Sequence, residues 1–468
     1  MSAIYSTLRN LTLGASTAIC LASCSLICPD GIDTAQDEKH IAEFHDAISS
    51  PSENILHQDD LSLFVDYSTC IAEGQHSAFY KQLVPSWVNA TKKYYSIKGP
   101  KISEESLSDS STYTRLLSVN EVNYADLKTA VKMMSESQSE SVLLTDGEYY
   151  NPTIDSAGAN NPYMADALKV WLKKGHDVFV IAEPYIEQNH GNSYHKNRFY
   201  FLFTDTRLKN NIYDRVRQTV DFKKFNSVNI FHLSADHPDV FFSADHPDVF
   251  SGGETAGLSS QPNPTLAATV TPGNGYEIQD WTVTWDVISD YIMGASNPKT
   301  GEPLPMGDYV VKDLSVNRLS FGGYVIKDVD IKVSDLNVAY TDFYNSCESK
   351  TKPAPITDLP DCPNFMQLDK KELNKGGGLK LHFDVIGFNP TFLKGKPYNY
   401  FKIDFFITKT ENAFDNIEKW FSFDLLGQPG QTNLSVVASI KQCLTDKDLQ
   451  NQMKQSPFYT IYIKSNKY

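Results

Sequence analysis

Two short clusters of oxygen-bearing side chains follow apolar runs in the first half of the chain. Asp66 ends the run Leu61–Asp66 and is followed by Ser68, and Asp146 ends a second run that begins at Ser141. Carboxylate and hydroxyl oxygens are the ligands that hard cations such as Mg²⁺ prefer. If the two runs are neighbouring strands, this pattern predicts a site for Mg²⁺ or Mn²⁺.

The segments around these residues alternate between apolar runs and helical periodicity. Such alternation predicts an α/β Rossmann-like domain with an open, mainly parallel sheet and helices on both faces. The carboxyl ends of the strands would carry the site. We expect strands at 61–66, 94–97, 141–147, 177–182, 199–203 and 228–233, helices at 74–91, 124–134, 163–174 and 213–220, and a surface loop at 100–112.

With these residues in this order, positions 58–235 resemble the von Willebrand factor A family. The resemblance implies that family's metal-ion-dependent adhesion site, which begins Asp-x-Ser-x-Ser and also uses a Thr and the Asp of a Thr-Asp-Gly sequence. Asp66, Ser68 and Asp146 match three of its positions, and Thr112 or Thr114 is the candidate for the Thr. In that family the bound cation keeps an open position, which an acidic side chain of the partner completes.

The chain departs from the family pattern at Cys70, which stands where the motif has its second Ser. A thiol is a poor ligand for Mg²⁺. Two other readings therefore stay open. One is a fold of this type with a non-functional metal site, in which Asp66 caps the following helix, and the other is a different α/β fold.

A metal-dependent hydrolase that uses the same two carboxylates is the alternative function. Ser68, Thr69 or Cys70 would be its nucleophile, and His190 and His195 lie in a polar loop between two predicted strands. However, the chain has no Gly-x-Ser-x-Gly sequence, phosphate-binding loop or His-Glu-x-x-His motif. Binding is therefore favoured over catalysis.

The N-terminus predicts a lipid anchor. An uncharged stretch from Leu11 to Ser23 is too short to span a bilayer and fits the core of a signal peptide. It ends in Leu-Ala-Ser-Cys at Leu21–Cys24, which resembles the lipobox of bacterial lipoproteins. The resemblance implies cleavage before Cys24 and lipidation of its side chain, so that the protein is anchored in the bacterial cell envelope, at the outer membrane or cell surface.

Charge and cysteine content limit the partners. The formal net charge is −15, and an acidic surface repels phosphate backbones, so nucleic acid is not an expected partner. Cys347 and Cys362 flank a Pro-rich loop and are the candidates for a disulfide bond in an oxidising compartment.

The second half of the chain changes to a period of two, which is typical of an antiparallel β-sandwich-like domain. In this pattern Phe401 and Phe405 are expected in its core, and Cys443–Met453 is expected to form one helix. A tandem repeat of Ser-Ala-Asp-His-Pro-Asp-Val-Phe at 234–241 and 243–250 suggests a duplicated loop, or alternatively a metal-binding pair. The predicted divisions are a signal peptide at 1–23, a flexible tether at 24–57, the α/β domain at 58–235, a duplicated loop and linker at 236–275 and the β-rich domain at 276–468.

The sequence therefore predicts a cell-envelope lipoprotein that binds a protein or glycan partner, with a divalent cation at the strand ends as the expected means of binding. A hydrolase and a structural surface protein with a non-functional metal site remain the alternatives.

Overall fold

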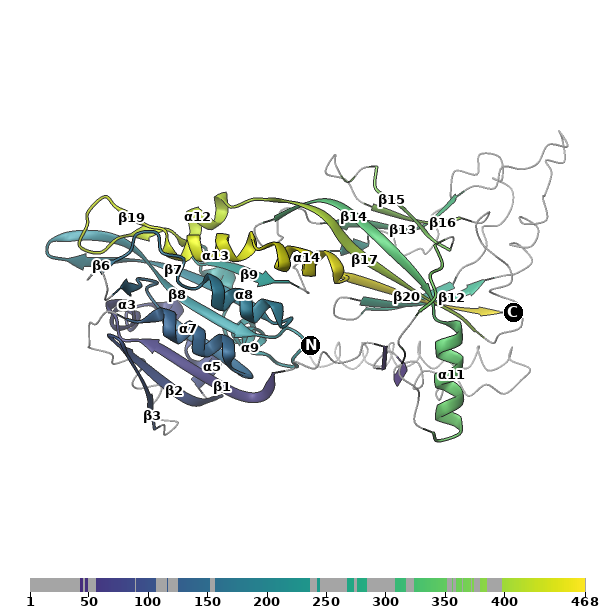
Figure 1. The fold of residues 1–468 in the computed structure, drawn as a ribbon, viewed down its shortest axis with the longest axis horizontal. Helices are drawn as coiled ribbons and strands as arrows, with labels where there is room; N and C mark the ends of the chain where they lie inside the picture. Colours follow the sequence, from purple (N-terminus) through teal and green to yellow (C-terminus); the bar gives the residue numbers. More distant parts are fainter. Residues whose placement is uncertain are drawn as a thin grey trace, which may run out of the picture. The chain divides into compact units, whose positions relative to one another are not determined.

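The computed structural model describes the two halves of the chain in unequal detail (Figure 1). The described residues are 43–44, 47–48, 56–88, 90–106, 116, 125–151, 156–235, 242–244, 267–272, 276–283, 308–316, 324–351, 356, 359–363, 365–371, 373, 379–384 and 398–467. The predicted signal peptide with Cys24, the Thr112 and Thr114 candidates and most of the tandem repeat lie outside them.

The first half forms an α/β unit around a seven-stranded sheet in the order β3-β2-β1-β4-β8-β7-β9. The sheet is mixed and not mainly parallel, because only β1 pairs in parallel, with β2 and with β4. The strands are β1 His57–Asp66, β2 Thr91–Lys98, β3 Lys101–Glu105, β4 Ser139–Thr145, β7 Asp177–Asn189, β8 Asn192–Thr204 and β9 Asn229–Ser234.

Helices bury both faces of this sheet, as the alternation of elements predicts. One face, with Phe64, Leu143 and Phe201, packs against α7 and α8. The other face, with Leu63 and Leu144, packs against α3, α4, α5 and α9. The helices are α3 Thr69–Gly74, α4 Ala78–Leu83, α5 Pro85–Val88, α7 Leu127–Glu136, α8 Ala165–Lys173 and α9 Ile212–Thr219.

One tight turn makes the pair β7–β8 antiparallel. His190 and Gly191 have φ angles of 49° and 80°, and they join β7 to β8 between the paired residues Asn189 and Asn192. Positive φ at both central residues is the geometry of a type I′ hairpin, whose twist matches that of the strands. The predicted polar loop is therefore wrong: His190 lies in the turn, and His195 lies within β8.

Three further predictions of local structure are corrected. Ser77 accepts a hydrogen bond from the Tyr80 N–H and so starts α4, which divides the predicted 74–91 helix. Asp446 likewise caps α14 by accepting from the Leu449 N–H, so that 443–453 is shared between two helices. The predicted loop at 100–112 contains the edge strand β3.

The second half is rich in antiparallel strands, as predicted. Its five-stranded sheet has the order β11-β12-β20-β17-β14, and its four-stranded sheet has the order β10-β13-β16-β15. Only the pair β12–β20 is parallel among these described strands. Phe401 and Phe405 are fully buried, as expected. The strands are β10 Phe242–Ala244, β11 Ala267–Pro272, β12 Tyr276–Val283, β13 Asp308–Val316, β14 Tyr324–Asp335, β15 Gln367–Asp369, β16 Leu379–Asp384, β17 Tyr398–Asn412 and β20 Tyr459–Lys467.

One part of the β-rich half returns to the α/β unit. After β17, the chain forms α12 Asp415–Phe421, β18 Phe423–Asp424, β19 Thr432–Asn433, α13 Ser435–Leu444 and α14 Lys447–Gln455. Helices α13 and α14 pack against α8, and β18 packs against β8 (Figure 1). The apolar core on this face of the sheet therefore includes Val436 and Ile440 together with Phe199.

The described residues between 43 and 48 and from 338 to 359 belong to a second compact unit. Within it, Phe44 of the predicted tether is fully buried and makes edge-to-face contacts with Tyr340 and Phe343 of helix α11, Asn337–Glu348. At this residue the predicted tether is therefore packed. The structure shows no disulfide bond between cysteines of its described part, and the pairing of Cys347 with Cys362 stays a prediction.

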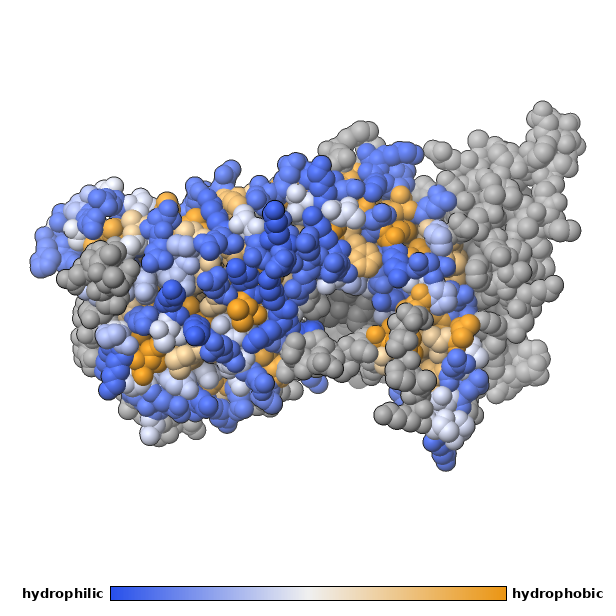
Figure 2. Space-filling model, viewed as in Figure 1, coloured by the Kyte–Doolittle hydropathy of each residue, from blue (hydrophilic) through white to orange (hydrophobic). Residues whose placement is uncertain are grey.

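The surface shown in Figure 2 is mostly hydrophilic over the described residues. Among them, the exposed large apolar side chains are Met133, Val170, Ile186 and Val338. None of the described helices is both long and apolar enough to cross a membrane.

Two glycines with positive φ should differ in how well they tolerate a methyl group. In Gly191→Ala the new Cβ meets no atom within 4 Å, so only the backbone strain of about 1 kcal/mol is expected. In Gly147→Ala the Cβ would lie 2.9 Å from carbon atoms of Phe199 and Val436, so the loss should reach about 3 kcal/mol. Urea unfolding of both variants measures this difference, and equal losses would contradict the packing of Val436 over Gly147.

Candidate functional site

The two carboxylates that the sequence singles out lie at the ends of adjacent parallel strands. β1 and β4 pair through Val65 and Leu144, one residue before Asp66 and Thr145. The Thr145 hydroxyl donates to Oδ2 of Asp66 at 2.8 Å. Asp146 Oδ1 in turn accepts from the Glu148 N–H at 2.8 Å. The structure therefore brings these carboxylates to one edge of the sheet.

Burial makes these carboxylates unusual. Asp66 is 1% exposed and Asp146 is 7% exposed. Oδ1 of Asp66 is buried and has no hydrogen-bond partner among the described residues. Burial, and then repulsion from Asp146, hold the pKa of Asp66 well above its ordinary value of 3.8. Burial also raises the pKa of Asp146, to about 7, although the Lys196 ammonium opposes the shift. Each carboxylate therefore favours a proton or a cation beside it.

Ser68 and Cys70 lie next to this pair, at the start of α3. The Ser68 Oγ and Cys70 Sγ are 3.0 Å apart, within hydrogen-bonding distance, and both side chains are buried. Burial, followed by repulsion from Asp146 and Asp66, raises the pKa of the Cys70 thiol well above its usual value. Cys70 is therefore a protonated, inert thiol, not an activated nucleophile.

The β7–β8 hairpin supplies a cation that sequence reasoning did not predict. β8 leaves its pairing with β4 at Phe199, opposite Thr145, and continues past the ends of β1 and β4. There Lys196, which is 1% exposed, forms a 2.5 Å ion pair with Glu148. Burial lowers the pKa of Lys196, but the Glu148 and Asp146 carboxylates more than offset this effect. Lys196 is therefore charged.

A second acid of the hairpin adds to the negative charge at this edge. Glu187 is buried, and burial raises the pKa of its carboxyl group, whereas Lys196 opposes the shift. We use the name strand-end cluster for these residues: Asp66, Ser68, Cys70, Thr145, Asp146, Glu148, Glu187 and Lys196. The cluster holds four carboxyl groups and one ammonium group, so its net charge is negative when every group is ionised.

Residues 420–436, called the strap here, cover this end of the sheet. The Leu426 N–H donates to Glu148 Oε1 at 2.9 Å, and Asp424 Oδ2 accepts from the His195 N–H at 2.7 Å. The Asn197 amide donates to the carbonyl oxygens of Trp420 and Ser422. The strap therefore closes the strand-end cluster from bulk water.

The same hairpin also binds the start of α3, which follows β1. Arg198 donates to the Cys70 carbonyl oxygen at 2.5 Å and to Glu183 Oε2 at 2.7 Å. Glu183 also accepts from the hydroxyl groups of Tyr200 and Ser77. This fully paired network fixes the position of Cys70 and Ser68 relative to β8.

The strand-end cluster fits a cation in part. The unpartnered Oδ1 of Asp66 and the two raised carboxyl pKa values suit a cation, whereas Lys196 already supplies some of the charge. Within the described residues, no group of three or more His, Cys, Asp or Glu side chains is arranged to hold a metal ion. Thr112, the predicted further ligand, lies outside the described residues.

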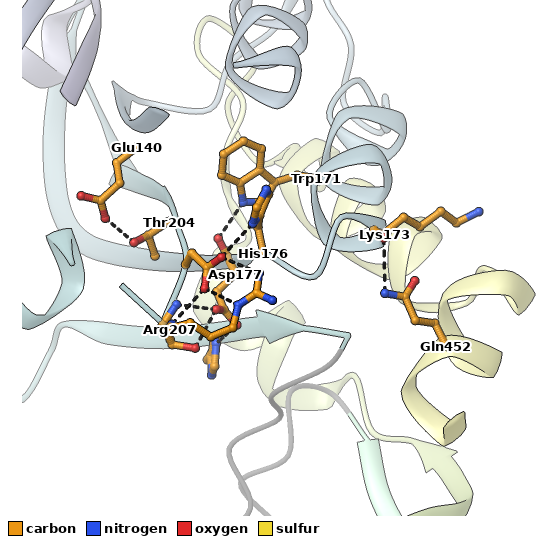
Figure 3. A network of polar contacts seen from close by, with 11 residues as sticks. Glu140, Trp171, Lys173, His176, Asp177, Thr204, Arg207 and Gln452 are labelled. Atoms are coloured by element: carbon orange, nitrogen blue, oxygen red, sulfur yellow. Dashed lines mark hydrogen bonds and ion pairs between the residues drawn. The ribbon is translucent and has the colours of Figure 1, made fainter. Parts of the chain in front are cut away.

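A second polar network at the opposite end of the sheet was not predicted (Figure 3). Asp177 accepts from the Thr206 N–H and hydroxyl and contacts His232 Nε2 at 2.9 Å. Asp205 contacts His176 Nδ1 at 3.0 Å and pairs with Arg207 through both carboxylate oxygens. These hydrogen bonds outweigh the effect of burial and hold the pKa of Asp205 well below its ordinary value.

This second network joins the start of β7 to the segment after β8 and to β9. His176, Asp177 and Asp205 are buried, and each histidine contacts an aspartate. Trp171 of α8 donates to the Asp177 carbonyl oxygen, which connects the helix to the start of β7. The adjacent pair His176-Asp177 at the start of a strand was the available sequence signal, but its partners lie about 30 and 55 positions away.

No family model matches the chain, and neither a curated protein nor a solved structure matches it.

The raised pKa of Asp146 makes a testable statement about stability. An aspartate in the unfolded chain ionises near pH 3.8, whereas Asp146 ionises in the fold at about pH 7. As the pH rises between these values, the unfolded state loses its proton first, so the free energy of unfolding falls and then levels off above pH 7. We therefore expect the free energy of unfolding to fall less in Asp146→Asn than in the wild type between about pH 4.5 and 7.5, by at least about 1 kcal/mol, when both are measured in EDTA.

Denaturant unfolding at the two pH values measures this difference. Asp60→Asn, at an exposed position of β1, is the control and should follow the wild type. A variant Asp146→Asn with the wild-type pH dependence would show that this carboxyl group is ionised across the whole range.

Proposed function

We propose that this chain is a lipid-anchored protein of the bacterial cell envelope that binds a protein or glycan partner, and that its strand-end cluster holds a divalent cation, Mg²⁺ or Mn²⁺. Asp66, Ser68 and Asp146 would hold the ion, directly or through water. Such an ion prefers oxygen ligands, so it would supply a positive charge that an acidic group of a partner can bind.

The unpartnered Oδ1 of Asp66 carries this proposal. A buried carboxylate oxygen without a hydrogen bond is costly, because ionised groups lose their hydration on burial. The neighbouring Asp146 carboxylate increases that cost. A cation between the two strand ends would remove both penalties at once, whereas Lys196 is committed to Glu148.

The von Willebrand factor A-like and β-sandwich-like folds belong to the same proposal. The parallel pairing of β1 with both β2 and β4 supports the first, since it sets Asp66 and Asp146 side by side. The antiparallel β8, β7 and β9 are a departure from a Rossmann-like sheet. The mainly antiparallel strands of the second half support the sandwich.

Catalysis by the same residues has less support. A hydrolase needs an accessible, activated nucleophile, but Ser68 and Cys70 are buried and the Cys70 thiol has a raised pKa. His190 and His195 lie in the hairpin turn and on β8, and neither is shown bonded to these residues. These observations favour binding over turnover.

The strap would limit how a partner reaches the ion. Ser68 is only 4% exposed, and the two aspartates are similarly buried. A partner's acidic group would therefore contact the cation only after residues of the strap near Glu148 move. Without such movement the cation would stabilise the fold and the partner would bind elsewhere.

Cation binding should be measurable on the chain from residue 24 onward. We expect one Mg²⁺ or Mn²⁺ ion per chain in calorimetry and a rise in Tm, because a ligand at about 100 times its Kd adds about 2.7 kcal/mol of stability. Asp66→Asn removes the unpartnered carboxylate charge and should weaken binding at least tenfold.

Asp60→Asn on the same strand is the matched control and should bind as the wild type does. If wild type and Asp66→Asn bind the ions equally, the site lies elsewhere. If neither binds, the cluster is a structural network stabilised by Lys196, and the alternative of a non-functional metal site is correct.

The lipid anchor has a separate test. Cys24→Ser should abolish incorporation of labelled fatty acid and release the protein from the membrane fraction, since a serine cannot receive the lipid through a thioether. Mass spectrometry of the wild-type N-terminus should show a lipidated Cys24. An unmodified N-terminus at a different residue would contradict the anchor without affecting the cation site.

A further inference from the structure

A cavity of about 290 Å³ lies beside the strand-end cluster and is separate from its carboxylates. Its walls are the β7–β8 hairpin, the start of β9 and the carboxyl end of α12 with the strap. Its size is close to the lower end of typical small-molecule sites, about 300 Å³. The cavity can therefore take a single small ring with its substituents.

The charge of this cavity is opposite to that of the chain. Its ionisable wall residues with basic side chains are His195, Lys196 and Lys419, and no aspartate or glutamate lines it. The whole chain has 57 acidic residues against 42 basic ones. Lys196 is neutralised by Glu148, whereas Lys419 makes no ion pair within the part of the chain that the structure describes. The cavity therefore suits an anionic group near Lys419 and His195.

Two aromatic side chains and two amides contribute to the walls. Trp420 is partly buried and lies edge-to-face against Phe421. An aromatic wall can cover the C–H face of a small ring. Tyr185 is the second aromatic residue, and its hydroxyl donates to Glu187.

The amide oxygens of Asn197 and Asn229 are two further polar groups, and Ser422 also lines the cavity. The Asn197 side-chain N–H groups donate to two strap carbonyls, and the Asn229 side chain donates to the Ser227 carbonyl oxygen. These bonds set the amide orientations and leave both Oδ1 atoms as acceptors. Acceptors of this kind bind ligand hydroxyl groups.

We propose that this cavity binds a carboxylated sugar, such as a uronic acid residue of a glycan. The carboxylate would lie at Lys419 and His195, the ring against Trp420, and its hydroxyl groups at Asn197 and Asn229. The proposal names a glycan class for the partner but does not rest on a cation at Asp66 and Asp146.

The probes for this proposal are D-glucuronate, D-glucose and acetate, each titrated into the full-length chain in detergent with EDTA present. For one sugar ring we expect a Kd on the order of 1 mM for glucuronate, and binding at least tenfold weaker for glucose and acetate. Saturation-transfer NMR and calorimetry measure these values.

Lys419→Glu should weaken glucuronate binding at least tenfold, since it places a like charge beside the carboxylate. Lys454→Glu makes the same change at an exposed position in the last turn of α14 and should leave glucuronate binding unchanged. Added salt should weaken binding by the wild type.

Glucose binding equal to glucuronate would overturn the carboxylate contact, and acetate binding equal to glucuronate would overturn the sugar. Absence of glucuronate binding would overturn the whole inference. Because EDTA is present, and because Asp66→Asn should leave glucuronate binding unchanged, failure here is distinct from failure of the cation site.

Discussion

The burial of carboxylates at the ends of β1 and β4 is the constraint on which this half of the structure depends. Parallel pairing brings Asp66 and Asp146 together, away from water. Burial and the Asp146 carboxylate raise the electrostatic cost of ionising Asp66, and burial and Glu148 raise that of ionising Asp146. A buried charge must be paired, protonated or bound to an ion. The β7–β8 hairpin and the strap supply partners for the buried charges at this edge of the sheet.

The β7–β8 hairpin meets this need on one side. It extends β8 past the strand ends, so that Lys196 reaches Glu148 and Arg198 reaches Glu183 and the start of α3. The strap meets it on the other side, through backbone N–H groups and carbonyl oxygens directed at Glu148 and Asn197. Hairpin and strap together also form the walls of the cavity at Trp420 and Lys419.

The opposite end of the sheet shows a contrasting solution. There the carboxylates of Asp177 and Asp205 receive hydrogen bonds from histidine, threonine and arginine, and the pKa of Asp205 is lowered. These hydrogen bonds stabilise the ionised form of Asp205. Asp66 differs, because its Oδ1 has no hydrogen-bond partner among the described residues and its pKa is raised.

The sequence by itself determined the features that depend on local pattern. Apolar period and strand-ending acids located β1 and β4 and placed Asp66 and Asp146 at one edge. The helix predicted at 163–174 is present as α8, which ends shortly before Gly175 with its φ of 80°. Only the tertiary structure decided the rest. Lys196, Glu187 and the strap lie about 40 to 370 positions from Asp66 or Asp146, so their proximity depends on a type I′ turn and on the return of the chain after β17. Neither leaves a periodic signal, because both are set by pairing and packing between distant segments.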